Sequence, residues 1–332
     1  MSATVRGVRR NWDLYLLIAP VLICILGHSR YGTEYETEKA GSDVEVSANK
    51  PNIVLINCDD LGYGDLGCYG SPVHRTPVLD RMAEEGIRYT DFYMAAPLCS
   101  PSRGAMLTGC YPKRIGFGTF EGRQVLFPGQ GVGLNPKEHT MAKALKEQGY
   151  STMLVGKWHC GDQPEFLPSN HGFDHYYGLP YSNDMGRQTG REDYPPLPLM
   201  LDDDVLQEQP DQASLTERYI EQSVRFIRQN KDTPFFLYLA HMHVHLPLYV
   251  PDRFLKQSRN GAYGAAVEGT GHVHGLSADV RRFGGGDAAG SARHRREGYS
   301  PDSSERTGCP LALRGVLLLP KRRTAAWSAR RL

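Results

Sequence analysis

The chain has 332 residues, of which 40% are hydrophobic, and a formal net charge of +1. This length accommodates one large α/β domain or two smaller ones, and the apolar content is sufficient for a hydrophobic core. A nearly neutral chain argues neither for nor against a membrane surface, and we predict no nucleic-acid partner. The seven cysteines have no regular spacing and include no Cys-x-x-Cys pair, so the sequence predicts neither a disulfide framework nor a structural zinc site.

Residues 1–27 resemble a targeting segment. Three arginines among the first ten residues precede an apolar run from Leu14 to Gly27, which is shorter than the ~20 residues that span a bilayer. A basic start and a short apolar run are typical of a signal peptide. Because Pro20 interrupts the run and no Ala-x-Ala motif follows, an uncleaved membrane anchor and a buried core helix are alternatives. We predict the secretory route, with a secreted, periplasmic, lysosomal or membrane-anchored product, and a polar linker over residues 28–50.

Strands and helices alternate along the middle of the chain. Apolar, β-branched runs predict strands, and the first of them, over 52–57, is typical of a strand buried on both faces. Capping residues and glycine stops mark the helices, as at Thr76 and Gly86. The run from Ser214 to Glu217 has the pattern of a capping box. The predicted strands cover residues 52–57, 87–92, 151–155 and 234–240, and the predicted helices cover residues 78–85, 101–109, 141–148 and 214–230.

This alternation implies an α/β fold with a doubly wound, mostly parallel sheet and helices on both faces, over residues 51–268. Beyond Glu268, arginine, glycine, alanine and serine dominate, and only Leu311 to Leu319 is apolar. Residues 269–332 are therefore expected to be a low-order tail. A basic nucleic-acid-binding tail is the alternative, but the composition resembles translation in a shifted reading frame or an aberrant splice end.

Two adjacent carboxylates, Asp59 and Asp60, follow the first predicted strand. Ligands gather at the carboxyl ends of strands in open α/β sheets, and paired carboxylates there suit a hard divalent cation such as calcium. Capping of the next turn is the alternative role for these aspartates.

The run Cys99-Ser100-Pro101-Ser102-Arg103 lies near the start of the second predicted helix. Backbone N–H groups and the helix dipole favour an anion at such a position, and Arg103, one turn along, can pair with anionic oxygens. The pattern therefore predicts a sulfate or phosphate group held against residue 99. The alternatives for Cys99 are an ordinary buried thiol and an unmodified thiolate nucleophile.

Further polar residues follow two later strands and one loop. Lys157 can neutralise a bound anion, and His159 can bond to residue 99 or move a proton. Histidines occupy positions 241, 243 and 245; alternate histidines fit tetrahedral zinc poorly, so His245 is instead a candidate donor to a sulfate oxygen. Ser182, in a loop, is a candidate substrate-binding hydroxyl. Structural core histidines are the alternative for each of these rings.

Taken in order, these pieces resemble the type I sulfatases, in the arylsulfatase branch of the alkaline-phosphatase-like fold. The similarity covers residues 51 to about 268 and includes the Asp-Asp strand end, Cys-Ser-Pro-Ser-Arg with Leu-Thr-Gly, Gly-Lys-Trp-His, Pro-Tyr-Ser-Asn-Asp and His-x-His-x-His-Leu-Pro. It implies that a formylglycine-generating or sulfatase-maturating enzyme converts Cys99 to Cα-formylglycine. It also implies that calcium is held by Asp59, Asp60 and residue 99, and that the sulfate group is surrounded by Arg103, Lys157, His159, Ser182 and His245.

The resemblance implies hydrolysis of a sulfate ester by covalent catalysis. The aldehyde hydrates, one hydroxyl attacks sulfur, and the alcohol leaves, protonated by a histidine or lysine. The second hydroxyl then loses its proton and sulfate is expelled. A phosphate or phosphonate ester hydrolase of the same superfamily and a non-catalytic fragment are the alternatives.

The sequence departs from the family pattern after Glu268. Family members continue with an Asp-Asn-Gly metal motif and a later lysine that contacts sulfate, whereas this chain has no Asp-Asn pair beyond Glu268. Half of the expected metal shell is therefore missing, and we expect a truncated sulfatase with little or no activity.

Overall fold

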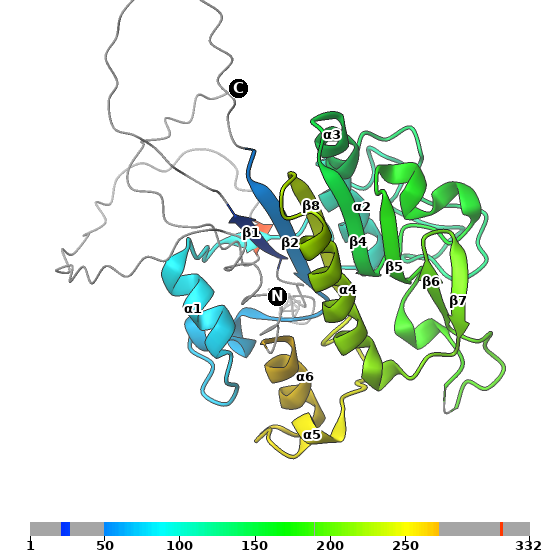
Figure 1. Cartoon of the computed structure of the whole chain (residues 1–332). Helices are drawn as coiled ribbons and strands as arrows, with labels where there is room; N and C mark the ends of the chain where they lie inside the picture. Colours follow the sequence, from blue (N-terminus) through cyan, green and yellow to red (C-terminus); the bar gives the residue numbers. More distant parts are fainter. Residues whose placement is uncertain (1–20, 27–49, 189, 272–312, 315–332) are drawn as a thin grey trace, which may run out of the picture.

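The computed structural model describes residues 21–26, 50–188, 190–271 and 313–314. Within these ranges, seven strands form one sheet in the order β1-β2-β8-β4-β5-β6-β7, and two more form a small second sheet (Figure 1). The described strands are β1 (Val21–Leu26), β2 (Asn52–Cys58), β3 (Phe92–Tyr93), β4 (Ser151–Lys157), β5 (His175–Leu179), β6 (Pro198–Leu201), β7 (Asp204–Glu208), β8 (Phe235–His241) and β9 (Leu313–Arg314).

The centre of the large sheet is parallel. β2 pairs with β8, β8 with β4 and β4 with β5 in parallel register, whereas β1, β6 and β7 join as antiparallel strands. The predicted α/β fold with a mostly parallel sheet is confirmed. Because β2, β4 and β8 run side by side in one direction, the residues that follow them meet at the same edge of the sheet.

Helices cover both faces of this sheet, with α4 in front and α2 and α3 behind in the view of Figure 1. The described α-helices are α1 (Pro77–Glu85), α2 (Cys99–Thr108), α3 (Met141–Glu147), α4 (Leu215–Gln229), α5 (Asp252–Leu255) and α6 (Gly261–Gly271). Successive side chains of a strand point to opposite faces, and β8 illustrates the result. Leu237 and Leu239 pack in one core cluster with Phe226 of α4, while Phe236 and Tyr238 belong to a second cluster with Leu107 of α2.

The strand predicted over 87–92 is wrong for most of its length. Residues 87–91 are exposed and form no strand, and only Phe92–Tyr93 pairs, in parallel with β9. The apolar residues Ile87 and Tyr89 lie on the surface instead, exposed by 42% and 37%. A short apolar run therefore does not form a strand here, because no strand of the described residues pairs with residues 87–91.

The long helix α4 is confirmed, but its predicted capping box is wrong. The Ser214 hydroxyl donates to the carbonyl of Asp211 (2.7 Å) and makes no cap bond to the helix, and Glu217 forms an ion pair with Arg253. The chain instead enters α4 through the 3-10 turn Gln212–Ser214, where Asp211 accepts from the N–H of Ala213 (3.1 Å). An earlier aspartate thus takes the capping role at the entry to this helix.

The predicted domain boundaries stay predictions, because the signal segment, the linker and most of the tail lie outside the described residues. Of the apolar run that begins at Leu14, only Val21–Leu26 is described, as β1 antiparallel to β2. In the described ranges, no helix is long and apolar enough to cross a membrane.

Candidate active site

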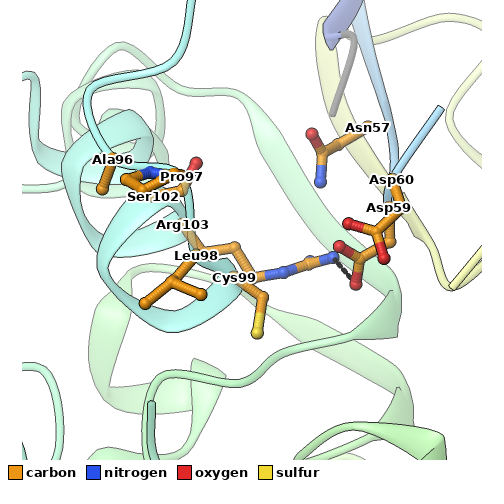
Figure 2. Close-up of a pocket in the computed structure, with 9 residues that line it drawn as sticks. All are labelled: Asn57, Asp59, Asp60, Ala96, Pro97, Leu98, Cys99, Ser102 and Arg103. Atoms are coloured by element: carbon orange, nitrogen blue, oxygen red, sulfur yellow. Dashed lines mark hydrogen bonds and ion pairs between the residues drawn. The ribbon is translucent and has the colours of Figure 1, made fainter. Parts of the chain in front are cut away.

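A pocket opens at the carboxyl end of β2, beside the first turn of α2. Figure 2 shows side chains from the end of β2 and the two residues after it on one side, and side chains from α2 and the preceding loop on the other. The pocket brings together residues from positions that are about 40 apart in sequence. It is lined by Asn57, Asp59, Asp60, Ala96, Pro97, Leu98, Cys99, Ser102 and Arg103.

Cys99 is the first residue of α2, with Leu98 in extended conformation as its N-cap. Its thiol is free and half-buried. The first backbone N–H groups of a helix lack partners within the helix and carry a partial positive charge. Residue 99 therefore lies at an anion-favouring helix end, as its sequence position predicts.

Arg103 follows one turn later and is only 2% exposed. Its Nη1 donates to the carbonyl oxygen of Lys157 (2.7 Å) and to the Tyr238 hydroxyl (3.4 Å), and its Nη2 donates to Oδ2 of Asp59 (3.2 Å). These three contacts hold the guanidinium across the ends of β2, β4 and β8. Burial by itself lowers the pKa of Arg103, but Tyr238 and Asp59 raise it further than burial lowers it, so the group stays charged.

Lys157, the last residue of β4, is completely buried. Its Nζ donates to Oδ2 of Asp59 (2.5 Å) and to Oγ of Ser182 (3.0 Å). Burial favours the neutral form of Asp59, yet the charges of Lys157 and Arg103 outweigh it and hold the pKa of Asp59 below its usual range. The structure thus brings together four predicted residues, namely Asp59, Arg103, Lys157 and Ser182. Lys157 and Ser182 lie outside the pocket lining, and Lys157 donates to both Asp59 and Ser182.

His159 lies in the loop after β4, and its side chain is buried. Its backbone has a left-handed conformation, with φ of 56°. The Nε2 of His159 bonds to the carbonyl oxygen of Leu126 (3.0 Å). The backbone N–H of Leu126 in turn donates to Oγ of Ser100 in α2 (3.1 Å). The Leu126 backbone therefore links His159 to helix α2. Burial, together with the charge of Lys157, lowers the pKa of His159 to about 3, so its ring is neutral at pH 7.

Asp60 is half-buried and, with φ of 62°, turns the chain sharply after β2. Burial and the charge of Asp59 both raise its pKa. Two adjacent carboxylates at a pocket suit a hard cation that prefers oxygen ligands. In the part of the chain that the structure describes, no three His, Cys, Asp or Glu side chains gather closely enough to hold a metal by themselves.

The three alternating histidines after β8 have different surroundings. His241 and His243 are buried with ring centroids 5.2 Å apart, whereas His245 is half-buried and its Nδ1 bonds to the carbonyl of Leu246 (2.6 Å). His245 lies outside the pocket lining. The charge of His245 nevertheless lowers the pKa of Asp59, although less than the charges of Lys157 and Arg103 do. The His245 ring therefore lies near the carboxylates.

Two residues of this site are not predicted by any sequence pattern. Tyr238 accepts from Arg103, and Asn57 lines the pocket with a buried Oδ1 that has no hydrogen-bond partner among the described residues. Both are polar residues inside otherwise apolar strands. The signal that could have identified them is that buried polar groups require partners, and that alternate residues of a strand share a face.

The buried histidines make the stability of the fold sensitive to acid. Burial lowers the pKa of His159 to about 3 and those of His171 and His243 to about 4, whereas an unfolded histidine titrates near 6.5. Below pH 6.5 the unfolded chain binds protons that the native chain does not, so the free energy of unfolding falls as pH drops toward about 4. Each such histidine contributes about 1.4 kcal/mol per pH unit. Urea unfolding at several pH values measures this slope.

His171→Phe provides the matched test, because both ring nitrogens of His171 are buried and have no hydrogen-bond partner in the described part of the chain. This variant is expected to have a shallower slope below pH 6.5. The control is Leu206→Phe, which introduces the same ring at an exposed position without a titratable group and should leave the slope unchanged. Equal slopes for wild type and His171→Phe would contradict the assignment.

Comparisons with known proteins agree with this geometry. The Sulfatase family model matches residues 51–273. N-acetylgalactosamine-6-sulfatase of Sus scrofa is 41% identical over 260 residues, which cover 73% of this chain and 49% of the relative. Arylsulfatase A of Homo sapiens is 42% identical over 238 residues, which cover 66% of this chain and 46% of the relative. The chain thus spans about half the length of the curated relatives it matches.

Solved structures agree as well. The crystal structure of Ps i-CgsB aligns with a TM-score of 0.60 at 31% identity and covers 68% of this chain and 54% of that one. The PsFucS1 sulfatase from Pseudoalteromonas sp. aligns with a TM-score of 0.60 at 28% identity, over 70% of this chain and 52% of that one. Because the family model spans more than half of the 332 residues, this chain belongs to the sulfatase family.

Proposed function

We propose that the pocket is the active site of a sulfuric ester hydrolase of the arylsulfatase type, with residue 99 as the nucleophile after conversion to Cα-formylglycine. The observation that carries this proposal is the convergence of Cys99, Arg103 and Asp59 on one pocket at a helix N-terminus. This arrangement places a reactive position, a cation and a carboxylate around the space where a sulfate group would bind. Membership in the family supports the same chemistry.

Each residue takes a role that its contacts allow. When formed and hydrated, the aldehyde at residue 99 supplies the hydroxyl that attacks sulfur. Arg103 lines the pocket and pairs with anionic oxygens, together with the N–H groups of the first turn of α2. Lys157 is a positioning residue, because its Nζ is engaged by Asp59 and Ser182; it compensates the carboxylate charge that a bound sulfate would otherwise meet.

The proton donor to the departing alcohol is proposed to be His245. His159 has a pKa of about 3, set by burial and by Lys157, so at neutral pH it carries no proton beyond the one that bonds Leu126. Because Nε2 carries that proton, Nδ1 is the acceptor nitrogen of the neutral ring, and it is buried and unpartnered among the described residues. His245 is half-buried and acts electrostatically on Asp59 and Asp60, so its ring lies near the carboxylates and within reach of solvent, where a proton donor to the departing alcohol is needed.

Asp59 and Asp60 are proposed to hold a divalent cation, with calcium as the candidate because both ligands are carboxylates. When bound, such an ion polarises the sulfate group and stabilises charge that develops during transfer. The further partners of this proposal are a sulfate-ester substrate and an enzyme that matures Cys99. Aryl sulfates and sulfated N-acetylgalactosamine are the substrate classes that the names of the relatives suggest. Export by the secretory route stays a prediction from the basic, apolar N-terminus.

The decisive experiment compares the full chain with Cys99→Ala after coexpression with a formylglycine-generating enzyme. Mass spectrometry is expected to find the aldehyde at residue 99, and sulfate release from an aryl sulfate should be slow but dependent on Cys99. Slow turnover is expected because, among the described residues, only Asp59 and Asp60 supply carboxylates to the pocket. Equal rates for the two proteins would contradict the proposal and favour a non-catalytic role.

A matched aryl phosphate in the same assay tests the second candidate, a phosphate or phosphonate ester hydrolase. A pocket with an arginine at a helix N-terminus favours tetrahedral anions of either kind. Faster Cys99-dependent release of phosphate than of sulfate would favour that candidate.

A further inference from the structure

Residues 120–130 form a loop beside the start of α2. Its backbone turns between Phe120 and Arg123, which exchange two backbone hydrogen bonds (2.8 and 2.9 Å). Gln130 closes the loop, because its Oε1 accepts from the N–H of Phe127 (2.6 Å) and its Nε2 donates to the carbonyl of Phe120 (3.4 Å). These contacts tie the two ends of the loop together and hold its exposed turn in one place.

The middle of this loop crosses the edge of the sheet where the site residues meet. Leu126 bonds through its N–H to Oγ of Ser100, the residue after Cys99, and through its carbonyl to His159, in the loop after β4. Leu126 belongs to the core cluster on the α2 face of the sheet, whereas Phe127 packs against the cluster on the α4 face. The loop therefore passes around the carboxyl edge from one face to the other and borders the position of residue 99.

Arg123 is an exposed cation on the turn of this loop. Its guanidinium carbon lies 4.1 Å from the centre of the Phe127 ring. Such a stack occupies one face of the guanidinium, whereas its N–H donors point outward in its plane. Among the described residues, the Arg123 side chain has no ion pair and no hydrogen bond, and the carboxylate on the same turn, Glu121, accepts from Gln130 instead (2.9 Å). The donors of Arg123 are therefore available to a ligand.

An anion is the partner that these donors suit, because a guanidinium binds carboxylate and sulfate oxygens through paired N–H groups. Arg123 is not part of the pocket lining beside Cys99, so it is placed to meet the alcohol part of a bound ester and not the sulfate group that is transferred. The stack on Phe127 already restricts the long arginine side chain, which lowers the entropy lost when a ligand binds.

We propose that Arg123 is a specificity-determining residue that binds a second anionic group, a carboxylate or another sulfate, on the alcohol part of the sulfate ester. The substrate class is then sulfate esters whose alcohol is itself negatively charged. This inference rests on the proposed function, since it requires a sulfate ester bound at residue 99. Arg123 is expected to act on affinity and not on the chemical step, because it would contact the substrate away from the sulfur atom.

The test is calorimetric titration of the full chain carrying Cys99→Ala, which has no nucleophile at residue 99. The probes are para-sulfooxybenzoate, para-sulfooxybenzenesulfonate and the neutral para-sulfooxybenzamide, so that the two charged probes distinguish a carboxylate from a sulfate-like group. Adding Arg123→Gln is expected to weaken binding of at least one charged probe roughly fivefold and to leave the amide unchanged. Arg123→Glu should weaken the charged probes further, and added salt should reduce the difference between the charged and neutral probes.

The matched control is Arg225→Gln, at another exposed arginine, which lies near the end of α4 and so toward the amino ends of the strands. It should leave all three affinities unchanged. Unchanged affinities in Arg123→Gln would overturn the inference, and so would an equal loss for charged and neutral probes, since a structural role does not depend on probe charge. Binding that is independent of Arg123 counts against this inference alone, whereas failure of every probe to bind counts against the proposed substrate site and the inference together.

Discussion

Asp59→Asn is expected to lower the free energy of unfolding by about 3–5 kcal/mol, because it removes the shared partner of two buried cations. Lys157 and Arg103 are 0% and 2% exposed, and both donate to Oδ2 of Asp59, at 2.5 and 3.2 Å. Asparagine keeps the shape of the side chain but leaves both positive charges uncompensated. Relief of the repulsion with Asp60 offsets little of this loss, since Asp60 is only half-buried.

Urea unfolding in the presence of a chelator measures this effect separately from any bound cation. The matched control is Glu85→Gln, which breaks the exposed Arg81–Glu85 ion pair (2.7 Å) and should cost at most about 0.5 kcal/mol. If Asp59→Asn costs no more than this control, the buried network does not stabilise the fold in the way its geometry implies.

The second large effect is expected from Gly156→Ala, in the strand that carries Lys157. Gly156 has a φ of 110°, and a Cβ there would lie 2.1 Å from the carbonyl oxygen of Ala240 in the adjacent strand β8. The new Cβ would be fixed to the backbone of β4 and would meet the backbone of β8, so no side chain can move aside to make room. β4 must therefore separate from β8 at this point. The expected loss of stability exceeds about 4 kcal/mol, and the movement would also carry Lys157 away from Asp59.

Circular dichroism with urea titration distinguishes this steric effect from a general intolerance of alanine. Gly131→Ala is the control, because no heavy atom lies within 4 Å of a Cβ built there, and it is expected to change stability by at most about 0.5 kcal/mol. If Gly156→Ala does not fold, recovery of soluble Gly131→Ala under the same conditions makes the comparison. A Gly156→Ala protein as stable as the control would contradict the close approach of the two strands.

The elements that the sequence predicts best are those whose own residues decide their environment. β2, β4 and β8 are apolar runs that only a buried central strand accommodates, and their predicted bounds differ from the observed ones by at most two residues at either end. β5, β6 and β7 are not predicted. They are short, and β7 is exposed along its whole length, so pairing with neighbours, which no local pattern records, makes them strands.

The candidate site divides in the same manner. Asp59, Cys99, Arg103 and Lys157 stand out in the sequence because polar residues after buried strands or at a helix start are expected to meet at one edge. That Lys157 and Ser182 contact the substrate stays a prediction of the sequence pattern, whereas only the fold reveals that Lys157 donates to Asp59 and to Ser182. The burial of Asp59, Arg103 and Lys157 in one network results from packing between segments that are distant in sequence. Their spacing along the chain therefore does not predict it.

The sequence by itself determined the candidate reactive position, Cys99, and the alternation of strands and helices that brings residues 59, 103 and 157 to one end of a sheet, because motif and periodicity are local. Only the tertiary structure decided which of these side chains line the pocket and which stabilise Asp59. It alone revealed the contact of Tyr238 with Arg103 and the Asn57 oxygen that has no partner among the residues the structure describes. The physical reason is that hydrogen-bond satisfaction and charge compensation depend on neighbours in space, which the fold brings together from remote parts of the chain.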